Sequence, residues 1–260
     1  KAKEVAEAAN HAKSRYLTGI SHELRTPLNA VLGYAQLLEQ DEEIPASRRE
    51  AIAVIRRSSE HLADLIEGLL DISKIEAGRL DLHRDQVRIR SLLDQIVHMF
   101  RLQAEARGIL FEYHCEGFLP EFVATDEKRL RQILINLLSN AIKFTEWGGV
   151  SFSVRYRNQV AEFTIRDSGI GIDKEDLERI FRPFERVRKP GMAAVPGTGL
   201  GLTITRLLTD IMGGDIAVQS TPGVGSTFIV TLMLSRIDTP SLAPVAARRV
   251  RGYAGARKTL

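Results

Sequence analysis

The stretch Ser21-His22-Glu23-Leu24-Arg25-Thr26-Pro27-Leu28 lies in a helical pattern that organises the first part of the chain. The apolar residues around it recur every three or four positions, so they share one face of a helix. They are Leu17, Ile20, Leu24, Leu28, Val31, Ala35 and Leu38. At about 100° per residue, His22 lies nearly opposite this face and is expected to point into water. Pro27 removes a backbone donor inside the helix, which predicts a bend.

A second helix is expected from Ser47 to Ala77, after a turn over Asp41 to Ala46. Its stripe has heptad-like spacing with two serine interruptions. The stripe consists of Ile52, Ile55, Ser59, Leu62, Ile66, Leu69 and Ser73. Gly78 would end the helix. Such a hairpin has one broad apolar face, which two copies would bury as a dimeric four-helix bundle. The alternative is a hairpin that packs only on its own C-terminal domain.

Composition limits the function classes that the chain can belong to. The net charge of its 260 residues is only +3, and basic residues gather near the end, which argues against a nucleic-acid-binding protein. The lone Cys115 excludes an intrachain disulfide and a cysteine metal cluster, which predicts a reducing compartment. No long apolar run predicts direct membrane insertion or a signal peptide, so we expect a soluble, cytoplasmic fragment. The sequence leaves membrane anchoring of a parent protein open.

Past Gly78 the pattern changes to short strands alternating with helices. Strands are expected within Leu80–Arg90, and a helix from Ser91 to Arg107 with Ser91 as its N-cap. A strong helix is expected from Asp126 to Phe144, and another ending at Met212. The remaining strands are expected at Ile109–Cys115, Phe122–Thr125, Val150–Arg157, Val160–Arg166, Asp215–Gln219 and Ser226–Leu234. This order predicts a multidomain chain in which an α+β sandwich with a mixed or antiparallel sheet follows the hairpin.

We expect three segments. They are a helical hairpin over residues 1–79, a sandwich domain over 80–236 and a flexible linker over 237–260. The chain begins within a helical pattern and ends on a linker-like tail, so we also expect it to continue beyond both ends.

Two glycine-containing motifs predict a ligand site. Asp167-Ser168-Gly169-Ile170-Gly171 directly follows a strand, and its glycines permit close approach of a flat ligand. The Asp167 carboxylate could accept a hydrogen bond from an exocyclic amine such as that of adenine; a tight turn capped by aspartate is the alternative. Gly197-Thr198-Gly199-Leu200-Gly201-Leu202 precedes a helix, where free backbone amides suit phosphate. Its spacing is neither that of a Walker loop nor of a dinucleotide fold. The segment Arg188–Pro196 before it is expected to be a lid.

Three polar residues share one face of the otherwise apolar helix expected from Asp126. Asn136 and Asn140 are one turn apart, and Lys143 is three positions further on. Amide oxygens beside a lysine fit Mg²⁺ coordination next to a polyphosphate. The alternative is a pair of buried asparagines that bond neighbouring backbone. Phe181-Arg182-Pro183-Phe184, by itself, indicates simple aromatic packing.

Together these motifs closely resemble those of two-component sensor histidine kinases, over residues from about 10 to 236. Ser21–Leu28 resembles the H box, and Leu130–Thr145 the N box. The remaining segments resemble the first glycine box at Asp167–Gly171, the F box at Phe181–Phe184, the second glycine box at Gly197–Leu202 and the last glycine segment at Gly223–Phe228. The resemblance implies a HisKA-type hairpin followed by an ATPase domain of the Bergerat (GHKL) fold, which DNA gyrase and mismatch-repair ATPases share.

The resemblance also implies residue roles. His22 would be the phosphoacceptor, modified to phosphohistidine, and Glu23 its orienting base. Thr26 would assist dephosphorylation of the partner. Asn140 would hold Mg²⁺, and Asp167 would bind the adenine amine. The ATP contacts would be completed by Asn136, Lys143, Gly169, Gly171, Gly197, Thr198, Gly199, Leu200, Gly201 and Thr227.

The implied activity is that of a protein-histidine kinase with ATP and Mg²⁺ as cofactors. The homodimer would pass its phosphoryl group to an aspartate of a response-regulator receiver domain. That domain would be a separate protein or, as in hybrid kinases, would follow residue 260.

Two rival functions belong to other classes. A conformational ATPase of the gyrase kind would not need His22 on a solvated face, so His22→Gln would leave its ATP turnover intact. A non-catalytic dimeric scaffold would bind no nucleotide, so Asn140→Ala would change nothing measurable.

Overall fold

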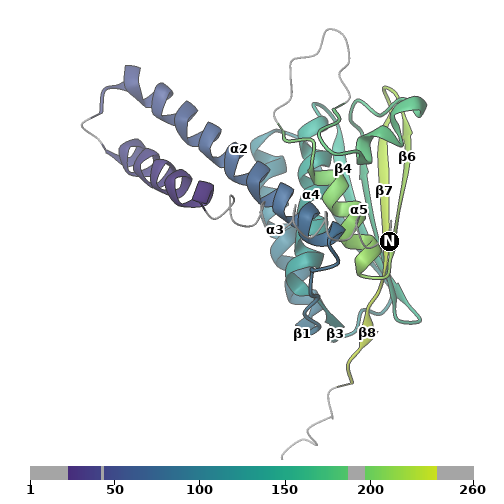
Figure 1. The fold of residues 1–260 in the computed structure, drawn as a ribbon. Coiled ribbons are helices and arrows are strands. Elements are labelled where there is room, and N and C mark those ends of the chain that lie inside the picture. The colour runs from purple at the N-terminus through teal and green to yellow at the C-terminus, as the bar shows by residue number, and fades with distance from the viewer. Residues whose placement is uncertain (1–22, 42–43, 187–196, 239–260) are drawn as a thin grey trace, which may run out of the picture.

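A computed structural model describes residues 23–41, 44–186 and 197–238 of the chain. Residues 23–40 are helical and pack beside α2 (Ala46–Glu76) as an antiparallel hairpin, which Figure 1 shows in purple and blue. The two expected helices are therefore confirmed over the described residues. The part of the first helix before residue 23 lies outside them.

The second unit is a two-layer sandwich of sheet and helices. Its helices are α3 (Ile89–Ala106), α4 (Glu127–Phe144) and α5 (Gly201–Ile211). A five-stranded sheet has the order β2-β4-β5-β7-β6, and β2 runs parallel to β4 while the other pairs are antiparallel. Its strands are β2 (Leu110–Glu116), β4 (Gly149–Arg157), β5 (Val160–Asp167), β6 (Asp215–Thr221) and β7 (Gly225–Met233). Of the two sheet types that the sequence left open, mixed or antiparallel, the structure has the mixed one.

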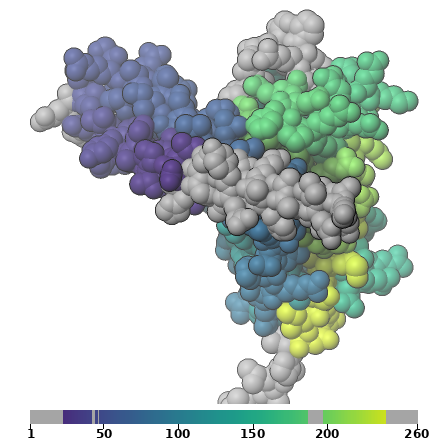
Figure 2. Space-filling model, in the orientation of Figure 1, coloured from purple at the N-terminus to yellow at the C-terminus, as the bar shows by residue number. Residues whose placement is uncertain are grey.

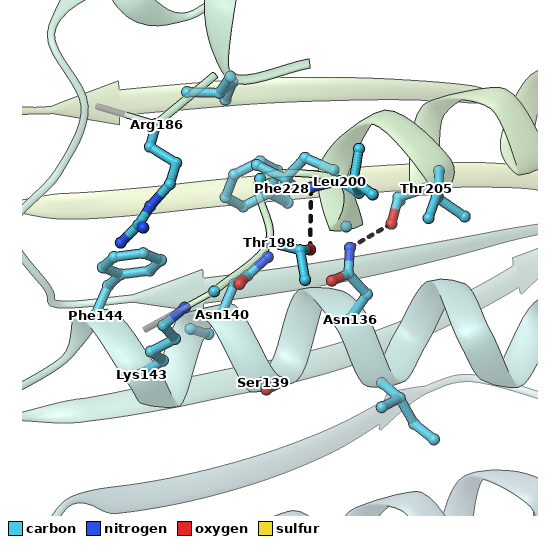
Figure 3. A pocket seen from close by; sticks show the side chains of 18 of the residues that line it. Asn136, Ser139, Asn140, Lys143, Phe144, Arg186, Thr198, Leu200, Thr205 and Phe228 are labelled. Carbon is cyan, nitrogen blue, oxygen red and sulfur yellow. Dashed lines mark hydrogen bonds between the residues drawn. The ribbon is translucent and has the colours of Figure 1, made fainter. Parts of the chain in front are cut away.

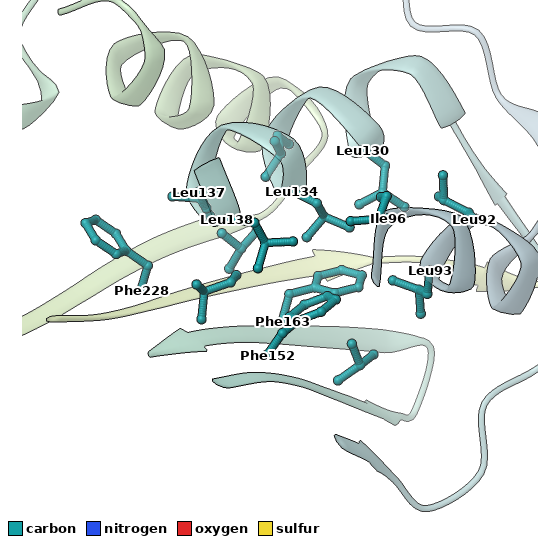
Figure 4. Close-up of a cluster of buried hydrophobic side chains, with 14 of the residues drawn as sticks. Leu92, Leu93, Ile96, Leu130, Leu134, Leu137, Leu138, Phe152, Phe163 and Phe228 are labelled. Carbon is teal, nitrogen blue, oxygen red and sulfur yellow. The ribbon is translucent and has the colours of Figure 1, made fainter. Parts of the chain in front are cut away.

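The helices cover one face of this sheet, and the core lies between the layers. Alternating residues of β4 and β5 point inward, as in Phe152 and Phe163, which are fully buried. Leu134 and Leu138 of α4 meet them, with Ile96 of α3 alongside (Figure 4). Burying each such side chain contributes roughly 1.5–3 kcal/mol. The packing therefore fixes α4 against the sheet and presents its opposite face to α5.

A three-stranded sheet closes the lower end of the sandwich in Figure 1. It has the order β1-β3-β8 and consists of β1 (Asp85–Arg88), β3 (Phe122–Thr125) and β8 (Ser235–Arg236). Within Leu80–Arg90 only the four residues of β1 form a strand, so the strand is shorter than the segment in which strands were expected. Two short 3₁₀ turns, η1 (Lys174–Asp176) and η2 (Arg179–Phe181), lie between β5 and α5.

The predicted N-cap of α3 is wrong. The helix begins at Ile89, directly after β1, with Arg88 at the cap position and no side-chain capping bond. Ile89 is only 1% exposed, so burying it within the first helical turn prevails over the capping preference of Ser91. By contrast α4 begins where the sequence places it, and Asp126 caps it, since its carboxylate accepts a hydrogen bond from the Arg129 amide at 3.0 Å.

Each helix of the hairpin has an inner row that the other helix buries and an outer apolar row that remains exposed. Leu28 and Ala35 are buried, and so is Ile52 of α2. The outer rows consist of Leu24, Val31 and Leu38 on one helix and of Ile55, Leu62 and Leu69 on α2, all at least 37% exposed. Spacings of seven residues in both rows are those of a helix-bundle seam. None of the helices in the described ranges has the length and apolar content that crossing a bilayer requires.

The C-terminal part of α2 packs on the sandwich domain. Asp71 accepts hydrogen bonds from Arg129 at 3.1 and 3.2 Å and from the Gln132 amide at 3.0 Å. Both ion-pair side chains are about a tenth exposed (11% and 9%). Gly68 lies so close to α5 that a Cβ there would be 3.0 Å from a methyl of Leu200. In Figure 2 the rest of the hairpin projects to one side of the sandwich. The predicted domain boundary at residue 79 thus lies just after this joint, the part of α2 around Gly68 and Asp71 that packs on the sandwich domain.

We expect Asp71→Asn to lower the free energy of unfolding by about 2 kcal/mol. It removes the charge from hydrogen bonds that contribute about 1.5–3 kcal/mol, and it leaves the Arg129 guanidinium buried without a counter-ion. Urea denaturation measures the change. The control is Glu162→Gln, which breaks a 2.7 Å ion pair to Arg155 at the surface and should cost under about 0.5 kcal/mol. Equal losses in the two variants would contradict a stabilising joint.

Candidate active site

A cavity of about 820 Å³ lies where α2, α4, α5 and the strand-end loops meet. Figure 3 shows the α4 and α5 side chains that face each other across it. This volume suits a ligand of drug or nucleotide size. The motifs that the sequence analysis identified separately, at three places in the chain, contribute to its lining.

The α4 side of the cavity carries the three predicted polar residues. Asn136, Asn140 and Lys143 all line it, together with Ser139. The Asn136 amide donates a 2.6 Å hydrogen bond to the Thr205 hydroxyl of α5. Burial, and then the nearby charge of Arg186, lower the pKa of Lys143. An anionic ligand would offset both effects, so this part of the cavity suits phosphate.

Asp167, at the end of β5, forms the opposite part of the site and is almost fully buried. Its Oδ1 accepts hydrogen bonds from the backbone amides of Gly169, at 2.9 Å, and Ser226, at 3.3 Å. Burial raises the pKa of the Asp167 carboxyl, and these two bonds oppose the rise. The fixed carboxyl can accept a further hydrogen bond from an amine-bearing ring, which supports the predicted adenine contact.

The glycines of the first motif permit close backbone contacts. A Cβ on Gly169 would lie 2.3 Å from the Phe144 carbonyl oxygen. Gly171 has a φ of +64° and lines the cavity, and a Cβ there would lie 2.1 Å from the Thr221 carbonyl oxygen. The tight loop therefore needs glycine at both positions. Gly169 itself lies behind Asp167 and not in the cavity lining.

The second glycine motif leads directly into α5. Its predicted contact residues all line the cavity: Gly197, Thr198, Gly199, Leu200 and Gly201. The Phe184 amide donates to the Gly199 carbonyl at 3.0 Å, so the aromatic segment predicted only to pack also holds this loop. The first amides of α5 lack intrahelical acceptors and carry the positive end of the helix dipole. These amides are suited to binding an anion beside α4.

Three predicted site residues lie away from the cavity, and two further predictions fall outside the residues that the structure describes. His22 and the expected lid, Arg188–Pro196, fall outside the described residues. Glu23 and Thr26 are exposed on the helix of residues 23–40, and neither lines the cavity. Thr227 does not reach the cavity either, because side chains alternate along β7 and it is Ser226 and Phe228 that face inward.

Other lining residues lie outside the sequence motifs, and three groups of them can be distinguished by their place in the fold. Ser226 follows from the alternation of β7, and Thr205 follows from its place one helical turn after Gly201. The third group consists of His61, Asp64, Glu67 and Gly68 of α2. Burial, followed by the charge of Glu67, raises the pKa of Asp64. Nothing local in the sequence indicates that α2 packs on this cavity.

The donor set fits a Mg²⁺ ion that arrives with a polyphosphate. Asn140 offers an amide oxygen in the cavity, while Asn136 is engaged with Thr205. Within the described ranges no three His, Cys, Asp or Glu side chains form a metal-binding group. Mg²⁺ usually keeps several waters and takes few protein ligands beside substrate phosphates. Asn140 is therefore the residue that would hold it.

Comparison with protein families matches both parts of the chain. Residues 12–78 match the His Kinase A (phospho-acceptor) domain. Residues 125–236 match the histidine kinase-, DNA gyrase B-, and HSP90-like ATPase domain. The second match contains all the cavity residues of α4, β5, α5 and β7.

Curated relatives are longer proteins of signal transduction. The chain is 39% identical to "Hybrid signal transduction histidine kinase B" of Dictyostelium discoideum, over 87% of this chain and 12% of that protein. It is 39% identical to "Virulence sensor protein BvgS" of Bordetella bronchiseptica, over 95% of this chain and 20% of that protein. The chain thus spans less than a third of the length of these relatives.

Solved structures share the fold. Full-length ShkA in complex with AMPPNP aligns with a TM-score of 0.72 and 34% identity, over 87% of this chain and 47% of that one. The histidine kinase ThkA, in complex with the response regulator protein TrrA, aligns with a TM-score of 0.59 and 24% identity, over 88% of this chain and 65% of that one. The second likeness concerns the fold alone. With both domain models matched in order, the chain belongs to the two-component sensor histidine kinases and comprises their phosphoacceptor and ATPase domains.

Proposed function

We propose that this chain binds Mg²⁺-ATP in the cavity between α4 and α5, phosphorylates itself on His22 and passes the phosphoryl group to an aspartate of a receiver domain. One observation carries the proposal. A single cavity contains two kinds of binding group. At one end lies the buried carboxyl of Asp167, which suits an adenine amine. At the other lie Asn140, Lys143 and the N-terminus of α5, which suit phosphate. The AMPPNP complex of the 34% identical ShkA supports the same ligand class.

The chemical step is an in-line transfer. A neutral ring nitrogen of His22 attacks the γ-phosphorus, a nitrogen–phosphorus bond forms, and the bond to the ADP oxygen breaks. Glu23 holds the proton on the other ring nitrogen and stabilises the charge that develops there. Lys143 and the first amides of α5 offset negative charge on the phosphates. Asn140 would hold a Mg²⁺ ion, which would supply further charge neutralisation at the phosphates.

The remaining site residues have supporting roles in this proposal. Asp167 selects the adenine ring, Gly169 and Gly171 shape the loop behind it, and Asn136 holds α5 in place. The segment Gly197–Gly201, including Thr198 and Leu200, covers the triphosphate. Thr227 does not line the cavity and has no role in this proposal. Thr26, one turn after His22 on the hairpin, would assist the reverse hydrolysis of the partner's phosphoaspartate.

Two partners complete the proposal. The exposed apolar rows of the hairpin suit a second copy of the chain, which would bury them in a four-helix bundle. The second partner is a response-regulator receiver domain, either separate or further along the same protein. The name of the 39% identical hybrid kinase supports this partner class. An exposed His22 would serve both the ATP domain and the receiver.

Incubation with γ-labelled ATP and Mg²⁺ tests the proposal. The protein should acquire label that acid removes and alkali does not, as expected of a phosphohistidine, and a chelator of divalent cations should prevent labelling. A folded, ATP-binding protein that acquires no label would overturn the autokinase. ATP turnover without label would instead favour the gyrase-like ATPase, and absence of nucleotide binding would favour the scaffold.

A further inference from the structure

Thr205 belongs to none of the sequence motifs, yet it connects the two helices that form the phosphate end of the cavity. Its side chain is 1% exposed and lines the cavity from the second turn of α5. Its hydroxyl accepts the 2.6 Å hydrogen bond from the Asn136 amide, drawn as a dashed line in Figure 3. A buried bond of this length, between helices far apart in the sequence, fixes their relative position.

Gly201 is the second contact of the same asparagine. A Cβ on Gly201 would lie 2.2 Å from Oδ1 of Asn136. Gly201 and Thr205 are four residues apart, so they lie on one face of α5. The carboxamide of Asn136 is therefore held between two successive turns, with its nitrogen on Thr205 and its oxygen against the first residue of the helix.

The contact of Asn136 with α5 sets the distance between two groups that the triphosphate must contact at the same time. The first amides of α5 stand at Gly201, and the proposed cation ligand, Asn140, lies one turn beyond Asn136 on α4. A shift of α5 along or around its axis would change the distance between them. The adenine end depends instead on Asp167, whose Oδ1 accepts hydrogen bonds from the amides of Gly169 and Ser226, and both donors lie outside α5.

We infer that Thr205 is a positioning residue for the triphosphate. Through Asn136, its hydroxyl holds the N-terminus of α5 at the distance from Asn140 that binding of the β- and γ-phosphates requires. The inference rests on the proposed function, since it assumes that the cavity binds ATP. It predicts that loss of the hydroxyl weakens binding of the phosphates and leaves binding of the nucleoside unchanged.

The test compares Thr205→Val with Thr205→Ser and Thr209→Val. Valine keeps the shape of threonine without the hydroxyl, and serine keeps the hydroxyl. Thr209 is the matched control, because it is fully buried one turn further along α5 and its hydroxyl donates to the Thr205 backbone carbonyl, at 2.8 Å. Calorimetric titration gives the affinities for Mg²⁺-ATP and for adenosine.

We expect Thr205→Val to bind Mg²⁺-ATP about tenfold more weakly, and the other two variants to stay within about twofold of the parent protein. Adenosine affinity should be the same in all four proteins. In a double-mutant cycle, adding Thr205→Val to Asn136→Ala should cause little further loss of Mg²⁺-ATP affinity. Both substitutions remove the same hydrogen bond, so their effects should not add.

Unchanged ATP binding by Thr205→Val would overturn the inference alone. So would equal losses for ATP and adenosine, or an equal loss in Thr209→Val, since either result would indicate a general packing defect. A parent protein that binds neither ligand would instead overturn the proposed function, and this inference with it.

Discussion

His22→Gln is expected to abolish the acid-labile label and to leave Mg²⁺-ATP affinity within about twofold of the parent protein. Glutamine keeps a polar side chain on the helix but offers no nucleophilic nitrogen. ATP affinity should persist because no residue described between 23 and 40 lines the cavity, which is built from α2 and the sandwich domain. Label is measured after incubation with γ-labelled ATP, and affinity by titration.

His61→Gln is the informative comparison for this variant. His61 is the hairpin histidine that lines the cavity in the described part of the chain, so proximity alone would make it the acceptor. If His22 is the phosphoacceptor, His61→Gln should remain labelled. Label that survives in His22→Gln and disappears in His61→Gln would move the phosphoacceptor to α2 and contradict the proposal.

Periodicity in the sequence predicted the helices because their buried faces are continuous. The apolar row of α4, from Leu130 to Leu138, needs only the 3.6-residue repeat to be recognised, and its Asp126 cap is local. The sequence did not predict the start of α3, because the burial of Ile89 is a tertiary effect. It did not predict β8 either, because a strand of two residues is too short to show an alternating pattern. Nor does local pattern show which strands are neighbours, so the parallel pairing of β2 with β4 came from the structure.

The residues of the candidate site also fall into those that local sequence predicts and those that only the fold reveals. Gly169 and Gly171 lie in a loop after a strand, and Gly201 begins a helix after a glycine-rich segment. Closely spaced glycines at such places are recognisable in the sequence, so these motifs indicated a ligand before any fold was known. Thr205 looks like an ordinary buried threonine until α4 is placed beside it. Likewise, the packing of α2 through Asp71 and Gly68 is a long-range contact between two units, which no spacing within either unit can indicate.

Gly169→Ala is expected to weaken Mg²⁺-ATP binding by at least about a hundredfold, equivalent to about 2.7 kcal/mol. The added methyl would lie 2.3 Å from the Phe144 carbonyl oxygen and 2.9 Å from Oδ1 of Asp167. The first neighbour is backbone at the end of α4, which also accepts a hydrogen bond from the Ile170 amide at 3.3 Å. Relief of the overlap must therefore move the loop away from α4 and turn the Asp167 carboxyl out of its place.

The same overlap should lower the free energy of unfolding by about 1–3 kcal/mol, the usual cost of overpacking. Gly33→Ala is the control, because a Cβ there meets nothing within 4 Å and the backbone is helical. That change should leave ATP affinity intact and stabilise the helix by up to about 1 kcal/mol. Titration with ATP and urea denaturation measure both effects. Normal ATP affinity in Gly169→Ala would mean that Asp167 does not bind the adenine, because its carboxyl cannot keep its present position beside a methyl group.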